Sequence, residues 1–136
     1  MKKYFVILCL FAFSCAHAQN IISVDTVSFS QHPITNTPLF SDSLVSSFCI
    51  SIIDQVPKHK HMYHAEHVLV LEGAGTMLLG DKELNIKKND LIYIPKNTFH
   101  SVKVTSNIPL KVLSFQAPYF DGKDRVFPVK EPEGAY

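Results

Sequence analysis

The sequence predicts an all-β protein built as one barrel or sandwich, and three observations support this fold class. Short runs of apolar and β-branched residues recur at intervals of about 8 to 12 residues. Gly, Pro, Asn and Asp residues, which form turns, separate these runs. No window carries apolar residues at the i, i+3, i+4, i+7 spacing of an amphipathic helix over three turns. We therefore expect almost no helix, and the length of 136 residues suits one domain.

Residues 1–18 have the pattern of a secretory signal peptide. Two lysines precede an uncharged apolar stretch at residues 4–13, and Ala16 and Ala18 are the small residues of a cleavage site. We expect cleavage after Ala18 and a mature periplasmic or secreted protein of 118 residues. A lipoprotein anchored at Cys15 is the alternative. It ranks second because the preceding residues lack the aliphatic side chain that is usual in a lipidation motif.

The composition of the mature chain excludes several classes of protein. The leader's apolar stretch is shorter than the roughly 20 residues that span a bilayer, and no later stretch is longer, so we expect no transmembrane segment. Without the two leader lysines, 11 basic residues face 12 acidic ones and form no cluster, so we expect no nucleic-acid partner. Cys49 is the one cysteine left. It cannot form an intrachain disulfide, and we expect it to be a small buried hydrophobic residue.

Residues 19–44 predict an N-terminal strand followed by a loop. Apolar and polar residues alternate within residues 21–29, which is the period of a half-buried strand. Pro33 and Pro38, with several Asn, Ser and Thr residues around them, predict that residues 31–43 form a loop.

Residues 45–117 predict the core of the barrel. A run rich in apolar residues from 44 to 53 is closed by Pro57, and short strands with turn residues between them follow. We expect these later strands at residues 67–71, 76–79, 83–86, 91–94, 99–104 and 110–116. Residues 118–136 contain three prolines and two glycines, which predicts an irregular C-terminal tail that wraps the barrel surface.

Four histidines and one glutamate fall within nine positions of this core. They are His59, His61, His64, Glu66 and His67. In a strand, His59 and His61 present their imidazoles on the same face. If the chain folds back after residue 65, the Glu66 carboxylate can meet them, and His100, which follows a Pro/Asn turn, supplies a fourth group.

Three imidazoles and one carboxylate suit one divalent transition metal ion, such as Fe, Mn, Co, Ni, Cu or Zn. Four protein ligands leave up to two positions for water or substrate on a metal that prefers six, so such a site can support chemistry. Taken alone, the pair His59 and His61 is equally compatible with a polar surface pair or an adventitious metal-binding patch.

The spacing of these residues resembles the two motifs of the cupin family. His59, His61, Glu66 and Gly73 match the first motif, HxH(x)3–4E(x)6G, and Asn89, Pro95 and His100 resemble the second, G(x)5PxG(x)2H(x)3N. The resemblance implies a double-stranded β-helix, or jelly-roll, barrel over roughly residues 45–117. It also implies that the metal ligands are His59, His61, Glu66 and His100.

Four positions depart from the motifs. Ile53 replaces the leading Gly of the first motif, Val104 replaces the closing Asn of the second, and Asn89 and Asn97 stand where the second has glycines. Asn is the next most tolerant residue after Gly for left-handed backbone, so we expect both turns to be kept. The departures concern the surroundings of the substrate, because all four ligands are present.

Strand parity predicts a cavity with the metal at one end and aliphatic side chains elsewhere. No Arg or Lys cluster is expected in it, which favours a small neutral or aromatic substrate over a sugar phosphate. The pocket candidates are Val68, Val70, Tyr93, Phe99, Val102 and Gln116. His67 is expected to point outward. His64 is a rival ligand, a partner that orients a ligand, or a solvated side chain.

Cupins include dioxygenases, isomerases, cyclases and decarboxylases, and fold alone does not choose among them. The complete ligand set and the apolar pocket favour a metal-dependent enzyme of the dioxygenase type. The alternatives are a non-catalytic module that binds metal and a small molecule, and a metal that only stabilises the barrel. The resemblance also implies a homodimer in which residues 21–29 add to a partner's sheet. Leu69, Leu71 and Leu113, expected on the outer face, support such a contact.

Overall fold

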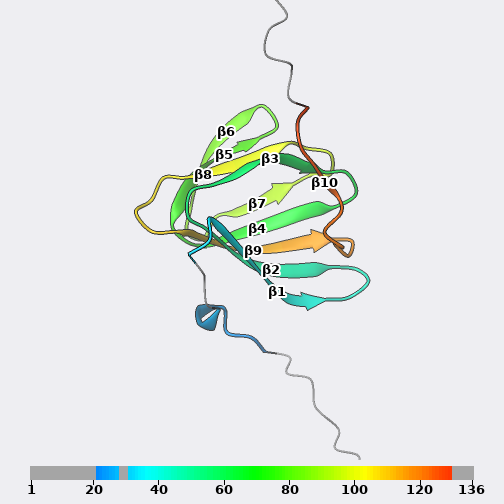
Figure 1. Ribbon diagram of the computed structural model, residues 1–136, viewed down its shortest axis with the longest axis horizontal. Coiled ribbons are helices and arrows are strands. Elements are labelled where there is room, and N and C mark those ends of the chain that lie inside the picture. The colour runs from blue at the N-terminus through cyan, green and yellow to red at the C-terminus, as the bar shows by residue number, and fades with distance from the viewer. Residues whose placement is uncertain (1–20, 28–30, 130–136) are drawn as a thin grey trace, which may run out of the picture.

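The computed structural model describes residues 21–27 and 31–129, which form two five-stranded sheets that face each other (Figure 1). The first sheet has the order β1 (Ile34–Ser41), β2 (Ser46–Ile52), β9 (Leu110–Ala117), β4 (Ala65–Glu72) and β7 (Leu91–Ile94). The second has the order β10 (Arg125–Val126), β3 (Gln55–His61), β8 (His100–Val104), β5 (Ala74–Leu79) and β6 (Lys82–Lys87). Neighbouring strands are antiparallel throughout. The predicted all-β barrel is confirmed.

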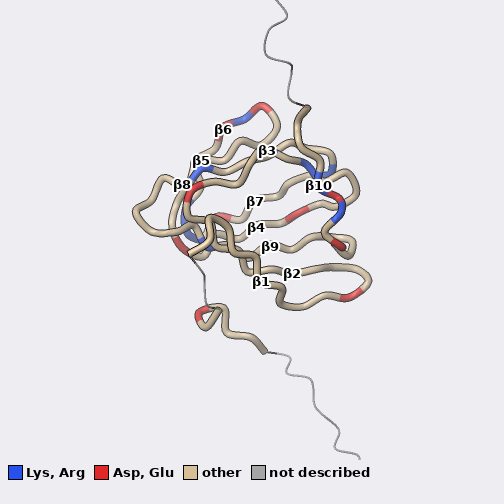
Figure 2. The backbone as a smooth tube through the Cα atoms, in the orientation of Figure 1, with Lys and Arg blue, Asp and Glu red and all other residues tan. Residues whose placement is uncertain are grey.

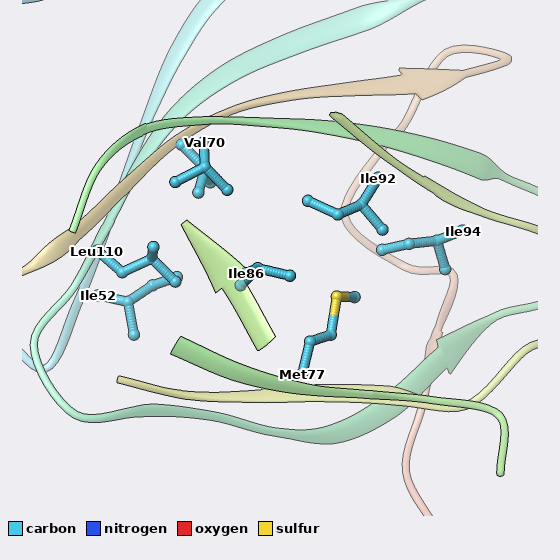
Figure 3. Close-up of a cluster of buried hydrophobic side chains, with 8 residues drawn as sticks. Ile52, Val70, Met77, Ile86, Ile92, Ile94 and Leu110 are labelled. Atoms are coloured by element: carbon cyan, nitrogen blue, oxygen red, sulfur yellow. The ribbon is translucent and has the colours of Figure 1, made fainter. Parts of the chain in front are cut away.

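Aliphatic side chains from six strands fill the space between the two sheets (Figure 3). The buried cluster consists of Ile52, Val70, Met77, Ile86, Ile92, Ile94, Leu110 and Val112. Because side chains alternate along a strand, each strand supplies every second residue to this interior. Burying each of the larger side chains contributes roughly 1.5–3 kcal/mol to stability, so this cluster is the main source of cohesion between the sheets.

The core continues along two strands into the histidine cluster. On β4, Glu66 is followed by Val68 and Val70 on the inward face, and on β8, Val102 lies two residues after His100 on the same face. The opposite face of the first sheet is also partly covered: Cys49 of β2 is fully buried there, as predicted.

Strand β1 lies where the sequence predicted a loop, so that prediction is wrong. Among the described strands, β1 lies at the edge of its sheet with β2 as its neighbour, and its register shifts between Pro38 and Ser41. A proline lacks an N–H donor, and an edge strand with an irregularity is a place where a sheet tolerates it. The hairpin is closed by Asp42, whose carboxylate accepts the N–H groups of Leu44 and Val45 at 2.7 and 3.0 Å.

The strand predicted for residues 21–29 is not present in its described part, residues 21–27. The chain instead forms a 3-10 turn, η1 (Val24–Thr26), in which the Thr26 hydroxyl donates to the Ser23 carbonyl at 2.7 Å. Alternation alone does not make a strand, because the backbone needs a neighbouring strand to accept its hydrogen bonds. No residue of the described segment 21–27 is paired with a strand.

The tail from residue 118 to residue 129 is irregular except for β10, a two-residue strand that pairs with β3. The predicted signal peptide, its cleavage site after Ala18 and the alternative anchor Cys15 lie outside the described residues. Where the chain is described, no helix is long and apolar enough to cross a membrane.

Asn89 and Asn97 both adopt left-handed backbone, with φ of 73° and 60°. This is the conformation expected from their places in the second motif, where glycines are usual. Gly73 is required both by its left-handed backbone and by a close approach of the chain. It has a φ of 76°, and a Cβ there would lie 2.6 Å from the Pro109 carbonyl oxygen.

The left-handed backbone at Asn89 predicts that a glycine substitution is tolerated better than an alanine substitution there. We expect Asn89→Ala to be less stable than Asn89→Gly by about 1 kcal/mol, because a Cβ without a compensating polar group strains this conformation. Urea denaturation of both variants measures the difference. At an ordinary position Ala is the more stable of the two, so equal stabilities or the ordinary order would contradict the assignment.

Candidate metal centre

A bulge in β3 turns His59 and His61 into the barrel. Val56 pairs with Val102 of β8, and His59 pairs with His100, so β3 advances three residues while β8 advances two. The extra residue changes which positions of β3 face inward. Val56 and the two histidines therefore all line the interior, although simple alternation would separate them.

Two turns bring the remaining groups to the same place. β4 begins directly after the corner at residues 62–64 and points Glu66 inward. β8 begins with His100 after a turn that is tied to β3, since the Asn97 N–H donates to the His61 carbonyl at 2.6 Å. His59, His61, Glu66 and His100 are all buried, with exposed fractions of 5%, 2%, 7% and 5%.

The distances between these groups suit a shared ion. Glu66 Oε2 lies 3.7 Å from His61 Nε2 and 3.6 Å from His100 Nε2. One ring nitrogen from each of His59, His61 and His100 lies within 4.8 Å of the others. Two ligand atoms about 2.1 Å from an ion lie about 3.0 Å apart at right angles and about 4.2 Å apart when opposite. Small inward shifts would complete such a shell.

Backbone carbonyls orient two of the rings. His59 Nδ1 donates to the Pro57 carbonyl at 2.8 Å, and His100 Nδ1 donates to the Thr98 carbonyl at 3.0 Å. In a neutral imidazole this leaves the Nε2 lone pair free for a metal.

The Glu66 carboxylate is held by two residues of β9. The Ser114 hydroxyl donates to Oε1 at 2.5 Å, and Gln116 Nε2 donates to the same atom at 3.5 Å. Oε2 is thereby left to face the imidazoles. The sequence analysis named Gln116 as a pocket residue but missed Ser114, although both lie on the same face of β9.

The unsatisfied atoms of the cluster indicate that a metal fits. Both ring nitrogens of His61 are buried without a hydrogen-bond partner, which costs about 1–3 kcal/mol for each unpaired group. Burial lowers the pKa of His59 to about 4, and the charges of His100 and Arg125 act in the same direction. Burial also lowers the pKa of His61, against the opposing effect of Glu66. His59 is therefore neutral at pH 7, which is the form that binds a metal.

His64 has a different role from those considered in the sequence. It is buried, its Nδ1 forms a short contact with the Asp124 carboxylate, and its Nε2 donates to the Tyr119 carbonyl at 2.8 Å. His61, His64 and Asp124 form a second group with donor atoms within 4.8 Å. Because both ring nitrogens of His64 are already engaged, this second group is the poorer candidate for a metal. His64 instead fastens the tail to the barrel.

Asp124 completes that attachment. Its carboxylate accepts the N–H groups of Met62, Tyr63 and His64 at 2.9, 2.8 and 3.1 Å. Although burial alone would raise it, the pKa of Asp124 is lowered by these donors and by the His64 ring. The buried carboxylate therefore caps the corner between β3 and β4 and holds the tail against it.

The cluster lies at one end of a cavity of about 140 Å³ whose remaining lining is mostly aliphatic. Of the pocket candidates, Val68, Val102 and Gln116 lie in the lining of this cavity, while Val70 belongs to the buried core. The tail adds Arg125, which the sequence analysis did not place in the pocket. One cationic side chain therefore lines the cavity, for which the sequence analysis expected no Arg or Lys cluster.

Two aromatic pocket candidates, Tyr93 and Phe99, do not line the cavity. Tyr93 is 54% exposed on the outer face of β7 and contacts the exposed His67 ring, with ring centroids 4.9 Å apart. Phe99 precedes His100 directly and lies beneath the ammonium groups of Lys58 and Lys60. Instead, Phe120 and Phe127 of the tail approach the site, at 5.3 Å from His61 and 6.1 Å from His59 between ring centroids.

Comparison with known proteins agrees with this geometry. The family model described as "Cupin domain" matches residues 53–115. An uncharacterized protein of Methanocaldococcus jannaschii, MJ1618, is 39% identical over 66 residues, which cover 48% of this chain and 53% of that protein. An uncharacterized Aquifex aeolicus protein is 35% identical, over 60% of this chain and 67% of its own length. The chain thus spans only about half of the first of these relatives.

Two further similarities concern an enzyme and a fold. Quercetin 2,3-dioxygenase of Bacillus subtilis is 35% identical over 54 residues, which are 40% of this chain and 16% of the enzyme. A Klebsiella pneumoniae protein with a double-stranded β-helix domain superposes with a TM-score of 0.72 at 17% identity, over 83% of this chain and 94% of its own. The second similarity shows the fold alone.

The ligand assignment predicts the effect of two histidine substitutions. We expect His61→Ala to weaken Zn(II) binding by more than about 100-fold, since loss of an outer partner alone costs 10–100-fold. His67→Ala is the matched control, because His67 is exposed and lies next to Glu66 in the sequence. Metal content by mass spectrometry and Zn(II) titration measure both, with circular dichroism as a check of folding. Equal metal binding by the two variants would contradict the assignment.

Proposed function

This chain belongs to the cupin family, and from its four converging donor groups we propose that it is a metal-dependent enzyme that acts on a small molecule. One observation carries the proposal: His59, His61, Glu66 and His100 meet at the end of an internal, mostly aliphatic cavity. Four protein donors leave positions for substrate on an ion that prefers six. A purely structural metal would be closed off by protein ligands.

The proposed cofactor is one divalent transition metal ion, namely Fe, Mn, Ni, Cu, Co or Zn. When bound, such an ion supplies Lewis-acid or redox chemistry. The protein's own residues prepare the site for it. The Pro57 and Thr98 carbonyls fix two rings, Ser114 fixes the carboxylate, and the aliphatic cavity limits the access of water.

Among the reactions of cupins, we favour a dioxygenase-type oxidation of a substrate with a small apolar or aromatic body. The apolar lining supports this choice, because a dry cavity suits a reactive oxygen chemistry that water would divert. The similarity to part of a quercetin 2,3-dioxygenase supports it independently of the cavity.

Oxygen consumption tests the proposal. The metal-free protein is loaded separately with Fe(II), Mn(II), Ni(II) and Zn(II), and small catechols and enediols are supplied. We expect oxygen uptake with a redox-active ion but not with Zn(II), retained by His67→Ala and lost in His61→Ala. Saturable binding without turnover under every metal would favour the non-catalytic binding module instead.

We also propose that the protein is exported and forms a homodimer. The N-terminal sequence pattern supports export. The outer face of the first sheet supports association, because Leu91, Tyr93 and Phe115 are 67%, 54% and 40% exposed there. Native mass spectrometry of the exported protein should give twice the mass of residues 19–136. A single-chain mass would contradict the dimer, and a lipid adduct at Cys15 would replace cleavage after Ala18.

A further inference from the structure

Arg125, an exposed residue of β10, is among the residues that line the cavity. β10 pairs with β3 so that Arg125 lies directly opposite His61. Residues opposite each other in an antiparallel pair project to the same face of the sheet. Arg125 therefore shares the inward face with the histidine cluster, and it is among the residues that line the cavity.

This positive charge has no partner among residues 21–27 and 31–129, where no hydrogen bond or ion pair engages the Arg125 side chain. The adjacent Asp124 carboxylate is directed away, to the corner at residues 62–64 and the His64 ring. Glu66 is held by Ser114 on one side and faces the imidazoles on the other. The cation is thus available to a ligand.

Contacts of the tail hold the backbone at Arg125 in place. Phe120 is buried edge-on against His61 and His64, with ring centroids 5.3 and 5.1 Å away, and Asp124 anchors the next segment. Basic and acidic residues alternate along the tail at this end of the molecule, where β10 runs beside β3 (Figure 2), and Lys123 is paired with Asp121 at 3.5 Å. The guanidinium itself is exposed, and its positive charge beside the histidine cluster attracts anions.

We propose that Arg125 recognises a carboxylate, so that the substrate is a small monocarboxylic acid with an apolar body. The planar fork of a guanidinium matches a carboxylate with two parallel hydrogen bonds. Arg125 offers one such fork, which suits one carboxylate group. The aliphatic lining and the volume of about 140 Å³ limit the rest of the molecule. This rests on the proposed function, and it replaces the neutral substrate expected from the sequence.

The test compares acids with amides of the same shape. Calorimetric titrations use benzoate against benzamide and isobutyrate against isobutyramide, with both Zn(II)-loaded and metal-free mature protein. We expect the wild-type protein to bind each acid at least about tenfold more tightly than its amide. Arg125→Gln should lose this preference while its affinity for the amide is unchanged, and Arg125→Lys should retain part of it.

Lys123→Gln is the matched control, because it removes the same charge from an 85% exposed side chain of the same tail. It should keep the full preference. Equal binding of acid and amide by the wild-type protein, binding of neither, or a preference that survives in Arg125→Gln would overturn the proposal. Thermal melting shows that each variant is folded.

The two proposals fail separately. Acid preference that depends on Arg125 in metal-free protein, with no metal ever bound, would leave this inference standing and remove the proposed enzyme. Tight metal binding with no Arg125-dependent preference would remove this inference and leave the proposed enzyme standing.

Discussion

The structure depends on satisfying polar groups that are buried together at one end of an apolar barrel. An imidazole or carboxylate withdrawn from water is costly unless protein atoms replace its hydration. Part of this hydration is replaced here by hydrogen bonds to the Pro57 and Thr98 carbonyls and from the Ser114 hydroxyl. The ring nitrogens of His61 are left without hydrogen-bond partners. The aliphatic core can extend up to the cluster because the polar atoms that lack hydrogen-bond partners lie close together, where one bound cation would interact with them.

The barrel and the tail contribute different residues to the site. The strands of the barrel supply the four donors of the proposed metal site, and their positions follow from pairing and from the bulge between Val56 and His59. The tail supplies what surrounds the opening, namely Phe120, Arg125 and Phe127. Asp124 joins the two parts through hydrogen bonds to a corner about 60 residues earlier in the chain. Changes in the tail can therefore alter which molecules are admitted without altering the ion's ligands.

Features that depend on local spacing could be predicted from the sequence, and features that depend on pairing could not. Period-two alternation places Val68 beside Glu66, and the left-handed turn at Asn89 follows from its side chain. Strand β1 was missed because an edge strand tolerates proline. Arg125 enters the site through the register of β10, which no local pattern encodes, whereas period-two alternation from Gln116 would have pointed to Ser114. Tyr93 and Phe99 were misplaced, although each directly precedes an inward residue and so faces outward.

The burial of Cys49 has a consequence for redox chemistry. Its thiol is fully enclosed within the first sheet, and burial raises its pKa. Oxidation and disulfide exchange require an accessible thiolate, so the folded protein presents neither the access nor the ionised form. Cys49, the one cysteine among the described residues, is therefore inert while the sheet is intact. Intermolecular disulfides can form only when the chain unfolds, which makes thiol accessibility a direct measure of how often this sheet opens.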